Sequence, residues 1–293
     1  FKAVKGFKTG LMNNIGTKKQ MRQDSPTLLS ERWLGTILVG VIALALIILW
    51  KIAASKTSAL ILPAPEAVVI RLFNFVSTGR AWPHIWITTQ EILAGFTLGS
   101  ILGIGFGTLT AEFSLARRII MPYVIFSQAL PKFALAPILV IWFGFGMGPK
   151  IIIAALIAFF PLMENTYLGL TSTPQGQLEV FRAFRASRWT TLIKLRIPHA
   201  VPAIFSGIRV ALMLSLVGAV VAEYVGANKG LGALIIVSQG TLDTELMFVA
   251  FVLLTALGFI IDTFHGHIYR HVLRRMYGRT SQDLEAPGGN VSV

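Results

Sequence analysis

The sequence predicts an all-α membrane protein that crosses the bilayer about six times. Of its 293 residues, 54% are hydrophobic and only 13% are charged, and the mean hydropathy is +0.70. These values lie far outside the range of soluble domains. The hydrophobic residues also gather in stretches of about 20, the length at which a helix crosses the hydrocarbon core while satisfying its own backbone hydrogen bonds.

Six stretches meet this length requirement. They are residues 33–53, 85–109, 119–143, 151–170, 203–225 and 246–268. We therefore expect a transmembrane domain over residues 31–275, a basic cytoplasmic tail over 1–30 and a disordered tail over 276–293. The third stretch is the least regular, because Pro122, Pro131 and Pro137 each remove a backbone donor and disfavour a continuous helix.

The positively charged residues predict the orientation of the chain. If the amino terminus lies inside, the inner segments hold 18 Lys and Arg residues and the outer segments hold 6. Cytoplasmic loops carry such an excess in membrane proteins. Both termini and the loop between the fourth and fifth spans are therefore expected in the cytoplasm.

That loop contains the basic stretch "LEVFRAFRASRWTTLIKLRIP", residues 178–198. Thr173 followed by Pro174 is a helix-start pair, and Ser187 is a second capping residue. We expect two short helices with a bend near residues 185–187, ended by Pro198. Such a unit is suited either to docking a partner protein or to meeting anionic lipid at the interface.

Apolar residues are expected to form one edge of each short helix. Leu178, Phe181 and Phe184 recur at intervals of three in the first helix, and Trp189 and Leu192 fall on one side of the second. The arginines of the stretch are expected to point away from these edges.

Polar residues at membrane depth are the second candidate site. Lys132 lies in the proline-broken third span, one turn after Ser127 and Gln128. An ionisable group there is costly unless it lines a cavity or is paired. We expect either a solute path at Lys132 or a structural pair with Glu164 or Glu91. The predicted path consists of Ser127, Gln128, Lys132, Glu164 and Asn165.

Two further acidic residues lie near the ends of spans. Glu223 precedes the glycine-rich stretch "GANKGLG" at the outer end of the fifth span, where it is a candidate outer gate. Asp262, in the sixth span, is expected to pair with Arg209. The alternative for both is simple anchoring at the interface.

Several classes of function are disfavoured. The chain has no cysteine, which excludes disulfides and thiolate metal sites. It contains no G-x-x-x-x-G-K-[ST] loop and no catalytic motif, so we expect a transport subunit with no cofactor or metal of its own rather than an enzyme. The sequence "GIGFG", residues 103–107, lies in an apolar span and indicates close helix packing. The positive charge is explained by loop bias, so no nucleic-acid partner is expected.

The basic stretch resembles the "EAA" coupling loop of permeases of binding-protein-dependent ABC importers. Glu179, Leu195 and the pair at 197–198 match that pattern at the same spacing, whereas Phe181 departs from an alanine and Arg185 from the family glycine. Five further pieces resemble the nitrate, sulfonate, taurine and bicarbonate branch in the same order. These are "LPAPEAVV", "PILVIWFGFG", "AFFPLMENTYLGL", "RASRWTTLIKLRIPHAVPAIFSGIRVAL" and "VVAEYVGANKGLGALI".

The resemblance implies a type I ABC importer transmembrane fold in the bacterial inner membrane, with a coupling loop over residues 173–200. It implies a permease homodimer or pseudo-dimer, two cytoplasmic ATPase subunits that bind ATP and Mg, and an extracytoplasmic solute-binding protein that delivers the solute. From its place at the outer end of the fifth span, Glu223 is expected either to contact that protein or to form the outer gate. The implied solute is small: an organic anion, a sulfonate, a nitrate-like ion or a vitamin-type compound. Among the expected ATPase contacts, Glu179 and Ser187 follow from their family positions. Phe181, Phe184 and Trp189 are expected from the size of their side chains, and Arg182 and Arg185 complete the set.

One alternative from another class is an ion-gradient-driven secondary transporter or channel that works without an ATPase. The broken third span suits it, because such carriers build their sites from discontinuous helices. The paired short helices of the basic loop have no evident use in such a carrier.

Overall fold

The computed structural model describes residues 27–278 and divides the chain into two compact units, Phe1–Ser58 and Ala59–Val293. In the first unit, α2 (Thr27–Ser55) includes an apolar stretch from Gly35 long enough to cross a membrane. The predicted tails, residues 1–30 and 276–293, lie largely outside the described residues.

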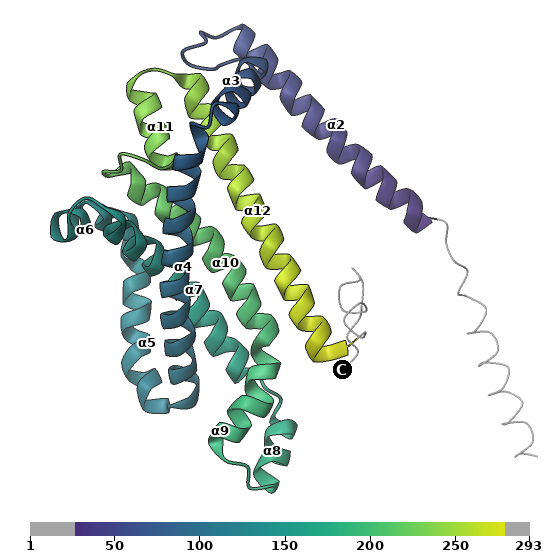
Figure 1. Cartoon of the computed structure of the whole chain (residues 1–293). Coiled ribbons are helices and arrows are strands. Elements are labelled where there is room, and N and C mark those ends of the chain that lie inside the picture. The colour runs from purple at the N-terminus through teal and green to yellow at the C-terminus, as the bar shows by residue number, and fades with distance from the viewer. Residues whose placement is uncertain (1–26, 279–293) are drawn as a thin grey trace, which may run out of the picture. The chain divides into compact units, whose positions relative to one another are not determined.

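The described part of the second unit is built from helices (Figure 1). Near its amino end lie α3 (Pro65–Ser77) and α4 (Ala81–Glu112), and Pro65 occupies the first turn of α3. The remaining elements are α5 (Ser114–Ala129), η1 (Lys132–Leu135), α6 (Ala136–Phe143), α7 (Met147–Thr171), α8 (Gln175–Ala183), α9 (Arg188–Thr191), η2 (Leu192–Arg196), α10 (Ile197–Tyr224), α11 (Leu231–Gly240) and α12 (Thr244–Tyr277).

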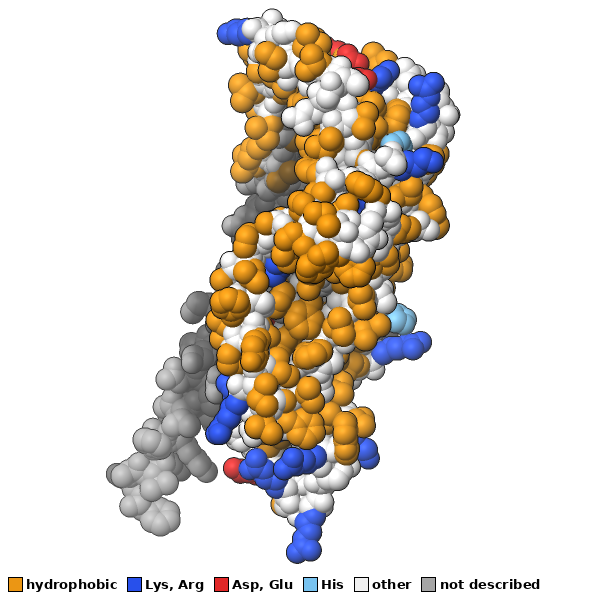
Figure 2. All heavy atoms as spheres, turned by 90° about the vertical axis from the view of Figure 1, so that its left-hand side faces the viewer, with side chains coloured by type: hydrophobic (Ala, Val, Ile, Leu, Met, Phe, Trp, Pro, Cys, Tyr) orange, Lys and Arg blue, Asp and Glu red, His pale blue; other side chains and the backbone are white. Residues whose placement is uncertain are grey.

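Long helices in this unit run alongside one another between two distinct ends (Figure 1). One end carries α8 and α9 and is called the α8–α9 end below. The opposite end carries α3 and α11 and is called the α11 end. On the face drawn in Figure 2, hydrophobic side chains cover the middle, and Lys and Arg side chains gather at the α8–α9 end. This distribution matches a lipid-embedded body with polar ends.

The expected spans are confirmed, with one of them broken. Among the described residues, five helices are long and apolar enough to cross a membrane, and a sixth span exists if α5 and the η1–α6 pair are counted together. The two halves of that span meet at 86°. Pro131 lies at the break, and Pro137 falls in the first turn of α6. Pro122, however, lies inside α5 without ending it, so only two of the three prolines shape the break.

A row of glycines brings α4 and α7 into close contact. Gly95, Gly99, Gly103 and Gly107 recur every fourth residue and are all buried. An added Cβ at Gly99 would lie 2.6 Å from the backbone oxygen of Ala155 in α7. One at Gly103 would lie 2.8 Å from the backbone oxygen of Phe159, one turn further along α7. Small residues at this spacing allow helix backbones to approach closely in membranes. The expected packing role of residues 103–107 is therefore confirmed.

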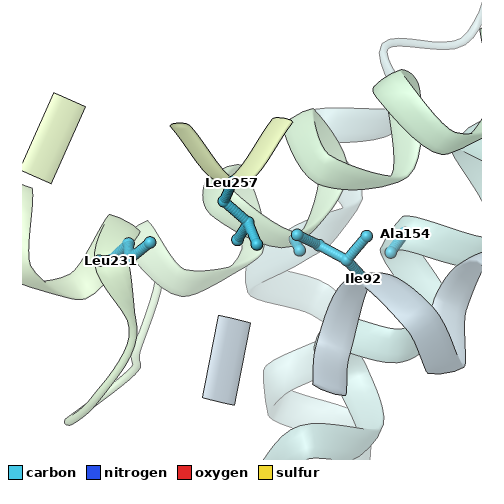
Figure 3. Close-up of a cluster of buried hydrophobic side chains, with 5 residues drawn as sticks. Ile92, Ala154, Leu231 and Leu257 are labelled. Atoms are coloured by element: carbon cyan, nitrogen blue, oxygen red, sulfur yellow. The ribbon is translucent and has the colours of Figure 1, made fainter. Parts of the chain in front are cut away.

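The hydrophobic core lies where α4, α7, α10, α11 and α12 meet. In Figure 3, Leu257 of α12 points toward Ile92 of α4, which lies beside Ala154 of α7. Leu231, the first residue of α11, belongs to the same cluster and is fully buried. This cluster joins the long helices to α11, which the sequence patterns did not predict.

Candidate functional site

The α8–α9 segment (residues 175–196) connects α7 to α10 and lies at one end of the unit (Figure 1). It consists of α8, α9 and the π-helical turn η2, which runs directly into α10. Two short helices were expected here, and the structure has them. Because η2 is continuous with α10, a displacement of the segment acts directly on a long helix.

Buried contacts anchor the inner side of this segment. Leu192 is 4% exposed and packs with Leu170 of α7 and Ala200 of α10. Arg196 donates through Nη1 to Oε1 of Glu112 at the end of α4, at 2.5 Å. The segment is therefore fixed to three long helices, α4, α7 and α10, at its base.

The outer side of the segment exposes aromatic side chains. Phe184 is 81% exposed and Trp189 is 68% exposed, whereas Phe181 is half-buried. The expected single apolar edge is wrong, because Leu178 and Leu192 point inward and the two aromatic residues point outward. The charged residues Glu179, Arg182 and Arg185 are exposed as well.

The bend between α8 and α9 uses a left-handed residue. Arg185 has φ +51°, a conformation that glycine adopts without cost and that other residues seldom adopt. The bend therefore forms at the position of the family glycine, although this chain has an arginine there. Ser187 caps α9 as predicted, since its Oγ accepts from the amide of Thr190 at 3.1 Å. Thr173 does not cap α8; it is buried and its hydroxyl donates to Leu170 of α7.

Substitutions at Arg185 should separate conformation from charge. We expect Arg185→Gly to keep or raise the stability of the bend by up to about 1 kcal/mol, and Arg185→Val to lower it by about 1–2 kcal/mol, because a β-branched residue is strained at positive φ. Hydrogen–deuterium exchange of peptides covering residues 175–196 measures this local stability. At Arg182, which lies within α8, substitution by glycine should instead lower the local stability more than substitution by valine. The same order at both positions would contradict a strained bend.

A cavity of about 690 Å³ lies between α5 and α7. Gln128 and Glu164, two of the predicted path residues, line it together with Arg117 and Arg118 of α5. Glu164 is exposed, and the structure gives it no ion pair among the described residues. The cavity thus combines both signs of charge beside the broken span.

The other predicted path residues do not line this cavity. Lys132 places its ammonium group 4.6 Å from the ring centre of Phe160. Ser127 and Asn165 are each hydrogen-bonded within their own helix, to the carbonyls of residues 124 and 161. The structure places no carboxylate of the described residues within 4.0 Å of Lys132, so the alternative pairs of Lys132 with Glu164 or Glu91 are not formed. Its role in a path remains a prediction.

Glu91 has a different partner, which sequence reasoning missed. Lys150 of α7 donates to Oε1 of Glu91 at 2.7 Å, and the two side chains are only 9% and 0% exposed. Lys150 is one of the six positive charges that the expected orientation assigns to the outer segments. Glu91 also interacts electrostatically with Glu223, so two buried carboxylates lie near each other here.

Glu223 holds the amino-terminal end of α11. Its Oε1 accepts from the hydroxyl of Thr88 at 2.6 Å, and its Oε2 accepts from the amides of Gly232 and Ala233. The Thr88 hydroxyl accepts in turn from the amide of Leu231 at 2.8 Å. A carboxylate is stabilised at a helix amino terminus because the free amides and the helix dipole favour negative charge.

The position of Glu223 corrects part of its predicted role. The residue is 1% exposed, so its carboxylate cannot contact another protein in this conformation. The outer-gate expectation stays a prediction. The sequence did contain a local signal for this cap, because Gly230 follows Glu223 by only seven residues. In the structure Gly230 has φ +132°, and the chain turns there into α11. The bond to Thr88, 135 residues away, had no such signal.

The predicted pairing of Asp262 is confirmed. Arg209 of α10 donates through Nε and Nη2 to the two carboxylate oxygens of Asp262 in α12, at 2.7 and 2.8 Å. This two-point geometry is the strongest form of an arginine–carboxylate pair. It cross-links α10 and α12 at membrane depth.

Comparisons with known proteins agree with this geometry. The model of the family described as "Binding-protein-dependent transport system inner membrane component" matches residues 95–274. A probable ABC transporter permease of Haemophilus influenzae is 37% identical over 75% of this chain and 89% of its own length. The riboflavin transport system permease RibX of Chloroflexus aurantiacus is 35% identical over 78% and 86%. The putative aliphatic sulfonates transport permease SsuC of Escherichia coli is 30% identical over 79% and 89%.

The fold is shared with a solved transporter. An inward-facing structure of the MetNI methionine ABC transporter superposes with a TM-score of 0.60 and 20% identity, covering 66% of this chain and 98% of the matched chain. The predicted type I ABC importer fold is thereby confirmed. The segment between α7 and α10, the broken span and the family match all lead to one assignment: the chain belongs to the inner-membrane permease family of binding-protein-dependent ABC transport systems.

Proposed function

We propose that this chain is the permease subunit of an ATP-driven importer and forms the path for a small solute across the bacterial inner membrane. Two copies would enclose the path. Two ATPase subunits carrying ATP and Mg would dock on the α8–α9 segment in the cytoplasm, where both termini also lie. A solute-binding protein would deliver the solute at the α11 end. Family membership argues against the gradient-driven alternative.

One observation carries the proposal. The α8–α9 segment exposes Phe184 and Trp189 on its outer side, while its base is fixed to α4, α7 and α10 through Leu192 and Arg196. Large exposed aromatic residues on a helical projection are typical of an interaction site. Force applied to them by a closing ATPase pair would reach three long helices at once. The α8–α9 segment would thus transmit movement of the ATPase to α4, α7 and α10.

The solute path is proposed at the broken span. The α5–α7 cavity extends along α5 as far as Gln128, three residues before the break at Pro131, and Glu164 lines it from α7. Irregular backbone at membrane depth is tolerated only where it lines a cavity or is buried in protein. Lys132 directly follows the break. Glu223 would control the outer end of the path by holding or releasing α11.

The solute is proposed to be small: an organic anion, a sulfonate, a nitrate-like ion or a vitamin-type compound. Arg117 and Arg118 line the α5–α7 cavity against one carboxylate, Glu164, which favours negative charge. Two relatives support this range by name, since one is called a riboflavin permease and another an aliphatic sulfonate permease. Selection among these solutes rests with the binding protein.

Reconstitution into proteoliposomes tests the function. The chain is co-purified with the ATPase encoded beside its gene and supplied with the neighbouring binding protein, and uptake of radiolabelled solute is measured. We expect uptake that requires ATP on the ATPase side and persists when a protonophore collapses the ion gradient. Lys132→Met should lower uptake at least about tenfold while leaving ATPase binding unchanged. A charged side chain inside the membrane is costly, and such residues commonly mark the path of a substrate or ion.

One result would contradict the importer function, and another would contradict the role of Lys132. Uptake by the chain without any ATPase, driven by an ion gradient, would show a secondary carrier. Full uptake by Lys132→Met would remove Lys132 from the path and leave the importer assignment intact. The matched variant Lys229→Met, which changes an exposed lysine before α11, controls for loss of positive charge.

A further inference from the structure

A second cavity lies at the α8–α9 end, on the inner side of the α8–α9 segment. It measures about 630 Å³ and is bounded by the turn between α4 and α5, by the end of α7 and by the segment itself. This volume falls within the range of small-molecule sites. The exposed aromatics Phe184 and Trp189, which carry the proposed ATPase surface, do not line it, and Arg182 is the one expected ATPase contact that does.

Four arginines from four elements converge on this cavity. They are Arg117 of α5, Arg182 of α8, Arg188 of α9 and Arg196 of η2. Figure 2 shows Lys and Arg side chains gathered at this end of the molecule. Glu112 is the one carboxylate among the lining residues, and it already binds Arg196. The walls therefore carry an excess of three positive charges.

Two of the four guanidinium groups, those of Arg117 and Arg196, have a partner in the structure. Arg117 lies over the ring of Tyr167, with its Cζ 5.1 Å from the ring centre. Within the described part of the chain, Arg117, Arg182 and Arg188 form no ion pair. Arg196 uses Nη1 for Glu112, whereas its Nε is buried with no acceptor among the described residues. A buried donor without an acceptor is unusual in proteins and indicates that a bound group supplies the acceptor.

We propose that this cavity binds a phosphate-bearing ligand. Guanidinium groups bind phosphate through paired hydrogen bonds, and several of them around one cavity suit a group with more than one negative charge. The phosphate comes either from the headgroup of an anionic lipid or from a soluble phosphate compound. Arg117 lines both this cavity and the α5–α7 cavity, whereas Arg182, Arg188 and Arg196 line this one and not the other. The inference goes beyond the proposed function, because it assigns these three arginines to a ligand other than the transported solute.

Its occupant would connect parts of the molecule that the importer has to move. A ligand held by Arg117 and by Arg182 and Arg188 spans α5 and both short helices of the segment. Binding would then stabilise one position of the α8–α9 segment relative to α5. An effect on ATPase coupling follows from the geometry, without contact with the nucleotide.

Binding is tested on the purified full chain in phosphatidylcholine nanodiscs, with inorganic pyrophosphate as the probe and calorimetry as the readout. We expect saturable binding that Arg182→Gln with Arg188→Gln weakens at least about tenfold, since two charge-assisted contacts are lost. Lys194→Gln is the matched control, because this exposed lysine belongs to the same segment and does not line the cavity. It should change the affinity less than about twofold, on the scale of a screened surface charge.

A second arm identifies the source of the phosphate. In nanodiscs containing phosphatidylglycerol, a lipid site would weaken pyrophosphate binding, and native mass spectrometry would show lipid retained by the wild type but not by the double variant. If the lipid has no effect on pyrophosphate binding, the ligand is a soluble phosphate compound. Either result supports the site.

Three outcomes overturn the proposal. The first is that the wild type binds neither pyrophosphate nor anionic lipid. The second is an equal loss of affinity in Lys194→Gln and the double variant, which would show unspecific charge attraction. The third is that the cavity is filled by an acidic segment of the ATPase, revealed by crosslinking from Arg188→Cys. Because binding is measured without transport, a failed uptake assay leaves this test unaffected.

Discussion

Replacing Phe184 and Trp189 together by aspartate is expected to separate the permease from its ATPase. These two side chains are 81% and 68% exposed on the outer side of the α8–α9 segment. Aromatic anchors at protein interfaces contribute about 2 kcal/mol or more each, and every 1.4 kcal/mol is a factor of ten in affinity. The double variant should therefore bind ATPase at least about 100-fold more weakly. The amount of ATPase that co-purifies in detergent measures the loss.

A matched pair at the other end of the unit provides the control. Phe73 of α3 and Trp82 of α4 are 72% and 60% exposed at the α11 end. Changing both of them to aspartate introduces the same chemistry in a place that the ATPase does not reach in the proposed orientation. Undiminished co-purification of the Phe184 and Trp189 variant would remove the α8–α9 segment as the docking site. Loss in the control pair instead would point to the opposite orientation.

Local signals explain why much of this segment was predictable. Ser187 caps α9 by accepting a hydrogen bond from the amide of Thr190, only three residues away. A capping residue inside the loop marks the start of a second helix, so a bend is expected just before it. The spans were predictable for the same kind of reason, since length and apolar composition are properties of a contiguous stretch. The direction of Phe184 was not predictable, because the spacing in the sequence does not say which of Leu178 and Phe184 becomes buried in the fold.

The broken span shows how far a local signal extends. Three prolines predicted irregularity between residues 119 and 143, and the 86° bend confirms it. The sequence does not say which proline breaks the chain, because Pro122 is accommodated within α5. A proline inside a helix is tolerated when neighbouring groups satisfy the freed carbonyl, and this is a property of the surroundings.

The buried polar cluster at the α11 end was beyond sequence reasoning for a different reason. Lys150 and Glu91 are 59 residues apart, and Thr88 and Glu223 are 135 apart. Neither pair follows from a periodic pattern in the sequence. The charge of Lys150 was already explained by the distribution of positive charges between inner and outer loops, so no partner was sought for it. The predicted ion pair that the structure confirms, between Arg209 and Asp262, is also distant in sequence. It was predictable because each residue is a charge inside an otherwise apolar span.

The pair of Lys150 and Glu91 predicts the largest change in stability. Lys150→Met is expected to lower the free energy of unfolding by about 3–5 kcal/mol, because it leaves a buried carboxylate without its counter-charge. The double variant with Glu91→Gln should recover most of this loss, since the carboxylate that Lys150 pairs with is then replaced by a neutral amide. Titration with sodium dodecyl sulfate, followed by tryptophan fluorescence, measures these free energies in mixed micelles.

An exposed ion pair separates the effect of burial from that of pairing. The Nη2 of Arg71 lies 2.8 Å from Oδ2 of Asp243, close to the 2.7 Å of the buried pair, but these two side chains are 43% and 32% exposed. Arg71→Met should cost about 1 kcal/mol or less, because surface ion pairs contribute little in water. If Lys150→Met costs no more than Arg71→Met, or if the double variant is as unstable as Lys150→Met alone, the pair does not hold α4 and α7 together at this depth. In that case Glu223 and its bonds to α11 alone would have to account for the order of the α11 end.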